Sequence, residues 1–137
     1  MKKLAIIVGL LVAMVSCSTD DSTNFFFDFV AVDSVTGIPD VFFVNQPDTL
    51  QVSYFRPTNC HGFDGFNIVR NDNEREITII TKVVEQDSGC PDLENDMRTA
   101  PLVFNPRESG EVILNFFNGN DADGNPNFLT FNVPVLE

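Results

Sequence analysis

The hydrophobic residues of this chain recur with a period of two rather than 3.6. Between Thr49 and Phe55, for example, Leu50, Val52 and Tyr54 alternate with polar side chains, which is typical of a half-buried strand. Comparable runs, rich in aromatic or β-branched residues and bounded by Gly, Pro, Asn and Asp, recur along the chain. They predict strands at residues 25–32, 49–55, 63–70, 76–84, 102–104, 111–117 and 128–135, with a brief edge strand at 41–44.

Two turn-rich segments predict hairpins between these strands. Residues 71–74 (Asn-Asp-Asn-Glu) join the strand at 63–70 to the strand at 76–84, and residues 118–126 join the last two strands. Residues 93–98 carry mixed charge and have room for one helical turn between flanking prolines. Because no long segment has a 3.6-residue period, we expect an all-β fold over residues 25–137, an immunoglobulin-like antiparallel β-sandwich of about seven strands.

A different pattern precedes the first strand. Met1-Lys2-Lys3 is positively charged and residues 4–15 are apolar and uncharged, which is typical of a secretory signal peptide. The apolar run is shorter than the roughly 20 residues that a membrane-spanning helix needs. Its end, Met14-Val15-Ser16-Cys17, resembles the lipobox of bacterial lipoproteins, with Met where Leu is usual. This resemblance implies a signal peptide at residues 1–16 and a lipid on the sulfur of Cys17; the alternative is ordinary secretion with Cys17 as a free thiol.

The residues after Cys17 extend this resemblance. Ser18-Thr19-Asp20-Asp21 resembles the acidic export tether of surface lipoproteins of Bacteroidetes, so residues 17–24 are expected to be a lipidated cysteine and a flexible tether; a solvated spacer would have the same composition. Together with Pro57-Thr58-Asn59-Cys60 and Phe116-Phe117-Asn118-Gly119, the chain resembles small outer-membrane lipoproteins of Flavobacteria that have no assigned activity. The resemblance implies an outer-membrane protein held by its lipid and exposed on the cell surface.

The other two cysteines predict a disulfide. With Cys17 acylated, Cys60 and Cys90 remain as one pair in an exported protein, where oxidation is the default. A metal site would need more ligands than two cysteines and His61, the chain's one histidine, and a redox pair would have two residues between the cysteines. We expect His61, beside Cys60, to be structural or simply exposed.

The charge of the chain excludes one class of partner. The net charge is −12, and it becomes −14 when Lys2 and Lys3 leave with the signal peptide. A surface this acidic repels phosphate backbones, so nucleic acid is not an expected partner. It also lacks a polybasic patch that would draw the domain onto anionic lipid.

The acidic loop at residues 118–125 raises the question of calcium, because hard oxygen ligands cluster there. An EF-hand register that uses Asp121 and Asp123 would put Gly119 and Thr130 at the first and last ligand positions, so two carboxylates are missing. A different kind of calcium loop, with Asp121 and Asp123 as weak candidates, stays open beside a plain solvated hairpin loop; we expect no dedicated metal site.

No catalytic motif is present: the sequence has no Gly-x-Ser-x-Gly elbow, His-Glu-x-x-His pair or Gly-rich phosphate loop. We therefore expect no enzymatic activity and no cofactor. Tyr54, Phe55, Phe63 and Phe66 flank the Pro57–Gly65 region and could stack on a ligand, but burial is expected, because a core without Trp must be filled mainly by the fourteen Phe residues.

The sequence thus predicts a lipid-anchored, non-catalytic envelope lipoprotein that serves as a binding or accessory module. Its partner would be an envelope protein or a glycan that the sequence does not identify. The alternatives are a structural envelope protein without a dedicated ligand and a calcium-binding β-sandwich. A contiguous exposed apolar or aromatic patch would favour the binding module, and a uniformly polar surface would favour the structural protein.

Overall fold

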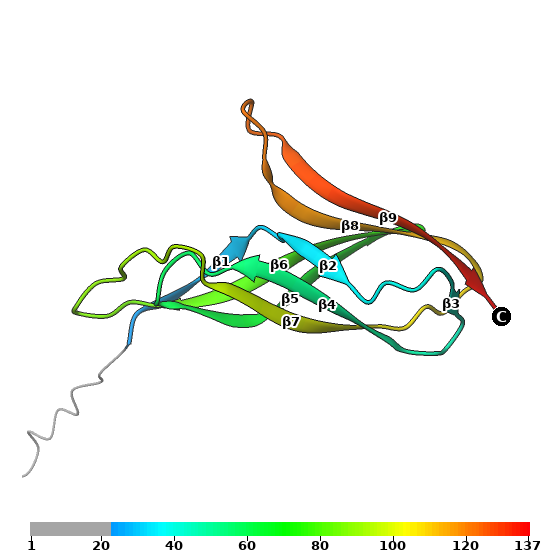
Figure 1. Cartoon of the computed structure of the whole chain (residues 1–137), viewed down its shortest axis with the longest axis horizontal. Helices are drawn as coiled ribbons and strands as arrows, with labels where there is room; N and C mark the ends of the chain where they lie inside the picture. Colours follow the sequence, from blue (N-terminus) through cyan, green and yellow to red (C-terminus); the bar gives the residue numbers. More distant parts are fainter. Residues whose placement is uncertain (1–22) are drawn as a thin grey trace, which may run out of the picture.

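The computed structural model describes residues 23–137, which form nine β-strands and no helix (Figure 1). In chain order the strands are β1 (Phe25–Val30), β2 (Ser34–Thr36), β3 (Phe42–Phe43), β4 (Asp48–Phe55), β5 (His61–Asn71), β6 (Glu74–Val84), β7 (Met97–Phe104), β8 (Gly110–Asn120) and β9 (Pro126–Leu136). Within these residues no helix is long and apolar enough to span a bilayer.

The strands form two packed sheets, so the predicted all-β, sandwich-like architecture is confirmed. The larger sheet has the order β1-β6-β8-β9-β3, and β5 also pairs with β6. Strand β1 pairs with residues 79–84 of β6, and β8 pairs with residues 74–77 of the same strand. Strands β1 and β8 therefore lie along one edge of β6, and β5 lies along the other edge. The smaller sheet has the order β2-β4-β7.

Alternation along the strands explains how the two sheets enclose a core. Leu50, Val52 and Tyr54 of β4 are buried as predicted, and so are Val112, Leu114 and Phe116 of β8. Val133 and Val135 of β9 complete this face, while Phe131 is half-buried beside it. The hairpins β5–β6 and β8–β9 also form as expected.

The core is aliphatic, and the expectation that Phe would fill it is wrong. Only Phe42 and Phe116 of the fourteen Phe residues are fully buried. Val, Ile and Leu supply most of the remaining core side chains. Eight Phe residues are instead exposed: Phe25, Phe26, Phe27, Phe29, Phe43, Phe55, Phe63 and Phe128. Most of the aromatic content of the chain therefore lies at the surface.

The strand arrangement differs from the prediction in three ways. The described residues form nine strands rather than about seven, because β2 is fixed by its pairing with β4 and not by any local pattern. The sheet is not purely antiparallel, since β6–β8 and β3–β9 are parallel pairs. Residues 93–98 form no helical turn; Met97 and Arg98 begin β7, an edge strand that can accommodate Pro101.

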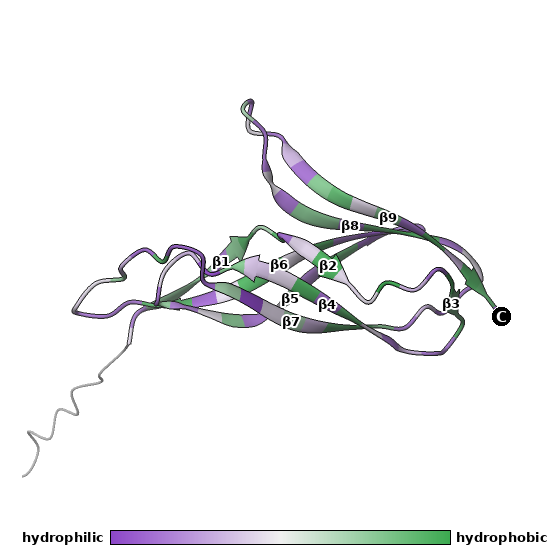
Figure 2. Cartoon of the chain, viewed as in Figure 1, coloured by the Kyte–Doolittle hydropathy of each residue, from purple (hydrophilic) through white to green (hydrophobic). Residues whose placement is uncertain are grey.

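The chain passes from the larger sheet to the smaller one between β1 and β2. The N–H of Val32 donates to the carbonyl of Phe117 at 2.7 Å, and Nδ2 of Asn118 donates to the carbonyl of Val32, also at 2.7 Å. Beyond this contact the β8–β9 hairpin projects away from the rest of the sandwich, and its outer part carries more polar residues than its base (Figure 2).

Candidate functional site

The main surface feature of the described chain is a group of exposed aromatic rings on β1. The exposed fractions of Phe25, Phe27 and Phe29 are 52%, 57% and 60%. These residues pair with Val84, Lys82 and Ile80 of β6, which are only half-buried. We call this set of six side chains the β1 patch.

Register explains why the β1 patch faces outward. Phe26, Asp28 and Val30 pair with Val83, Thr81 and Ile79, which are buried. The β1 patch therefore lies on the opposite face of the sheet from the core. Strand β1 is also at the end of the sheet order, so its second edge has no strand partner within residues 23–137.

Contacts within the β1 patch order its rings. The rings of Phe25 and Phe27 pack edge to face with 5.8 Å between centroids, and Nζ of Lys82 lies 4.0 Å from the centroid of Phe25. An ammonium over an aromatic face is a favourable cation–π contact. This patch was not predicted from the sequence, although a run of four Phe in five residues, without alternation, puts aromatic rings on both faces of one strand.

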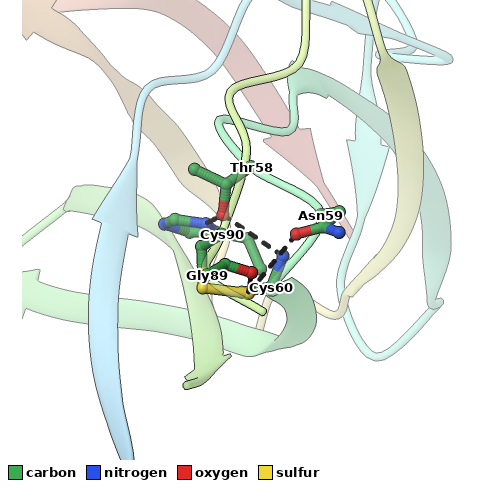
Figure 3. The surroundings of a disulfide bond; sticks show 6 residues. Thr58, Asn59, Cys60, Gly89 and Cys90 are labelled. Atoms are coloured by element: carbon green, nitrogen blue, oxygen red, sulfur yellow. Dashed lines mark hydrogen bonds between the residues drawn. A yellow bond between two sulfur atoms is a disulfide. The ribbon is translucent and has the colours of Figure 1, made fainter. Parts of the chain in front are cut away.

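The predicted disulfide is present, and Figure 3 shows its surroundings. It lies close to the β1 patch, because the N–H of Val84 donates to the carbonyl of Cys60 at 3.1 Å. Cys60 and Cys90 are bonded, with 5.4 Å between their Cα atoms. The bond joins the segment before β5 to the loop after β6, and backbone hydrogen bonds from Leu93 to Pro57 and from Asn59 to Pro91 support the same connection. The loop is thereby fastened to the start of the β5–β6 hairpin.

His61 is buried and held from both ring nitrogens. Its Nδ1 lies 2.7 Å from Oγ1 of Thr58, and its Nε2 lies 3.3 Å from Oδ2 of Asp28. The hydroxyl of Thr58 also accepts the N–H of Cys60 at 3.2 Å. Thr58, His61 and Asp28 thus form a chain of side-chain contacts that joins the segment before β5 to β1.

Tyr54, Phe55, Phe63 and Phe66 do not share one environment. Tyr54 is buried, which raises the pKa of its hydroxyl, and Phe66 is half-buried, whereas Phe55 and Phe63 are exposed. Tyr54 and Phe63 line a surface hollow of about 270 Å³ between β5 and β7. The expectation of burial therefore holds for only part of this group.

The two arginines beside that hollow are already paired. Asp96 Oδ2 lies 2.7 Å from Nε of Arg56, and Asp96 Oδ1 lies 3.1 Å from Nε of Arg98. Hydrogen bonds from Arg98 and then Arg56 lower the pKa of the Asp96 carboxyl. Since both guanidinium groups share one carboxylate, neither is unpaired.

The two calcium candidates, Asp121 and Asp123, lie in the β8–β9 loop, and of the two only the Asp121 side chain accepts hydrogen bonds from within residues 23–137. Asp121 Oδ1 accepts the N–H groups of Asp123 and Asn125 at 2.9 and 2.8 Å. These bonds, led by those from Asn125, lower the pKa of the Asp121 carboxyl. Over residues 23–137 no three His, Cys, Asp or Glu side chains converge as a metal site would require.

The predicted signal peptide, the lipidation site Cys17 and all but the last two residues of the tether lie outside the described residues. Comparison of the chain with models of protein families, with curated proteins and with solved structures finds no match.

Proposed function

We propose that this chain is a lipid-anchored, non-catalytic lipoprotein of the outer membrane that acts as a binding or accessory module for another envelope protein. The β1 patch is the observation that carries the proposal. A contiguous exposed aromatic surface distinguishes a binding module from a structural protein with a uniformly polar surface. Burial of such rings in an interface stabilises a complex, because each ring removes a large apolar area from water.

The position of the β1 patch in the sequence supports an envelope partner. Phe25 follows Cys17 by eight residues. A chain spans at most about 3.6 Å per residue, so an anchor at Cys17 keeps the first ring of the patch within roughly 30 Å of the lipid. A protein in or on the same membrane is therefore within reach of the β1 patch.

The proposal also includes a location, the cell surface, and a specific fold, the immunoglobulin-like sandwich. The acidic tether supports display on the cell surface, and the lipobox-like Cys17 supports the outer-membrane lipid anchor. The packed sheets and the passage of the chain between them at residues 31–33 support an immunoglobulin-like arrangement within the sandwich. The resemblance to Flavobacteria-type lipoproteins is part of this proposal.

In-cell photo-crosslinking tests the binding role. A photoreactive amino acid replaces Phe27 in the β1 patch and, in a matched control, Val103 of β7, which is an exposed apolar residue on the other sheet. In cells that make the protein naturally, we expect a discrete protein adduct from position 27 and none from position 103. An adduct with lipid alone, equal labelling from both positions, or no adduct from position 27 would contradict a protein partner at the patch.

The anchor is tested separately by intact mass and membrane fractionation of the wild-type protein and of Cys17→Ala. We expect an acylated mature protein that begins at Cys17, is found in the outer-membrane fraction and is removed from whole cells by protease. An unmodified soluble wild-type protein would overturn the lipoprotein assignment, whatever the crosslinking result.

A further inference from the structure

A cavity of about 450 Å³ opens near the end of the sandwich that is distant from Phe25. It lies between the β5–β6 turn and the connection from β7 to β8, and its lining includes Arg70, Arg75, Asn105 and Arg107. Phe25 pairs with Val84 at one end of β6, while Arg75 lies near the other end. At about 3.3 Å per residue, these two places are roughly 30 Å apart along the strand.

The arginines of this cavity differ from those beside Asp96. The ion pairs within 4.0 Å over residues 23–137 involve only Arg56, His61 and Arg98 among the basic groups. Arg70 and Arg75 are direct cross-strand partners in the β5–β6 hairpin, and like charges placed in this way destabilise a sheet. Three of the chain's five arginines thus line one cavity without a carboxylate partner in the described domain, although the chain is strongly acidic.

The hydrogen bonds that Arg75 and Arg107 make leave most of their N–H donors available to a ligand. Nη1 of Arg75 donates to the carbonyls of Asp72 and Glu74, both at 2.7 Å, which fixes its direction. Nη1 of Arg107 reaches Oδ1 of Asn45 at 3.4 Å. A guanidinium group carries five N–H donors and binds carboxylate or phosphate through two of them at once.

The lining of the cavity is not uniformly basic. Oδ1 of Asn105 meets no hydrogen-bond donor within residues 23–137, but this atom is closed to solvent and therefore also to a ligand in the cavity. The lining also includes the carboxylate-bearing residues Asp72, Glu108 and Glu111, which accept hydroxyl donors and repel densely charged polyanions.

We propose that this cavity binds a hydroxylated carboxylate, that is, a sugar acid either free or as a unit of an oligosaccharide. The carboxylate is held by the guanidinium groups of Arg70 and Arg107. The hydroxyl groups donate to the lining carboxylates of Asp72, Glu108 and Glu111. Phe104, Val112 and Val135 provide an apolar part of the lining for the C–H face of the ligand. This site goes beyond the proposed function, because it concerns the opposite end of the domain and does not depend on acylation of Cys17.

The test is a titration of the purified mature protein, followed by NMR of its backbone amides and by calorimetry. The probes are galacturonate, trigalacturonate, galactose and acetate. We expect the two acidic sugars to shift the amide signals of residues 70–75 and 103–111. Galactose lacks the carboxylate and acetate lacks the hydroxyls, so each should bind about tenfold more weakly. Tighter binding of trigalacturonate than of galacturonate would identify the oligosaccharide as the source, and equal binding would identify the free acid.

Matched variants assign the contacts. The double variant Arg70→Gln, Arg107→Gln should weaken galacturonate binding about tenfold or more, and the double variant Glu108→Ala, Glu111→Ala should reduce the preference for galacturonate over acetate. Arg98→Gln removes a positive charge outside the cavity, where Arg98 is paired with Asp96, and should leave binding unchanged. Failure of both acidic sugars to bind, equal binding of galactose, or equal losses in the arginine double variant and Arg98→Gln would overturn the proposal. Shifts outside the two named segments would also do so.

Discussion

Oδ2 of Asp28 lies 3.3 Å from Nε2 of His61, and this contact crosses β6 to join β1 to the beginning of β5. Between them, the buried hydroxyl of Thr81 donates to the backbone carbonyl of Asp28 at 3.2 Å. His61 follows Cys60 directly, so the contact connects the strand that carries the β1 patch to the disulfide. The patch is in this way supported by a fixed part of the fold, although its rings are exposed.

Asp28→Ala should lower the free energy of unfolding by about 1 kcal/mol, because the buried Nε2 of His61 loses its acceptor while the Asp28 side chain itself is half exposed. Amide exchange along residues 79–84 of β6, which pair with β1, should become faster. A double-mutant cycle with His61→Ala isolates the coupling between the two side chains. Strict additivity in that cycle, or an equal effect of the control Asp33→Ala, would show that the contact does not stabilise β1.

The double variant Cys60→Ser, Cys90→Ser tests the contribution of the disulfide. The two cysteines are 30 positions apart, and on the chain-entropy model closing a loop of that length contributes about 3 to 4 kcal/mol to the free energy of unfolding. Urea unfolding followed by circular dichroism measures the loss, with Ser88→Ala as the control in the same loop. Recovery of two alkylatable thiols from the unreduced wild-type domain would contradict the bond itself.

The sequence predicted those parts of the fold that depend on local pattern. Alternation placed Leu50, Val52 and Tyr54 in the core, and turn residues located both hairpins. It did not predict β2 or the parallel pairing of β6 with β8, since these depend on which distant strands meet. Fourteen Phe residues indicated an aromatic core, but composition does not say which face of a strand is covered, and β1 lies at a sheet edge.

The candidate sites also differ in whether local sequence is enough to predict them. The disulfide was predictable, because the expectation of export with Cys17 acylated left Cys60 and Cys90 as one pair in an oxidising compartment. The arginine-lined cavity was not, because Arg70 and Arg107 are distant in sequence and meet only where the β5–β6 hairpin lies beside the connection from β7 to β8. The exposed β1 patch could have been expected from its lack of alternation alone.

Phe116→Ala and Phe27→Ala should have very different effects on stability. Phe116 is fully buried and packs edge to face with Phe131 at 6.0 Å between centroids, so its truncation should cost about 3 to 5 kcal/mol. Phe27 is more than half exposed, and its replacement should cost less than about 1 kcal/mol. Thermal unfolding of the two variants beside the wild type measures the difference. A large loss from Phe27→Ala would assign the β1 patch a structural role in place of a binding one.

Asn118→Ala tests how the crossing between the sheets is held. The side chain donates to the carbonyl of Val32 at 2.7 Å, beside the backbone bond from Val32 to Phe117. Loss of this donor should lower the free energy of unfolding by about 1 kcal/mol. Chemical denaturation measures it, and Asn127→Ala, on the facing strand and without a side-chain hydrogen bond in the described domain, is the control. Similar losses in both variants would assign the effect to the hairpin in general.

Asp121 should make the stability of the domain depend on pH in the acid range. Hydrogen bonds from Asn125, Asp123 and Gly124 hold the pKa of its carboxyl below the ordinary value of 3.8. For a carboxyl whose pKa is lower in the folded state, the stabilisation is fully present above the unfolded-state pKa and is lost as the pH falls through the folded-state pKa. The contribution of Asp121 should therefore be complete at pH 5 and above and should decline below about pH 4.

Asp121→Asn keeps an acceptor oxygen but removes the charge, so it should lower stability at neutral pH and flatten the decline in acid. Carboxyl-carbon NMR titration reads the pKa of Asp121 directly, and urea unfolding at a series of pH values reads the linked stability. Asp123→Asn is the matched control, because the side chain of Asp123 accepts no hydrogen bond within residues 23–137. Parallel stability profiles for the wild type and Asp121→Asn would show that the loop bonds do not contribute to folding. A rise in melting temperature with calcium that Asp121→Asn abolishes would instead show that the carboxylate is a metal ligand.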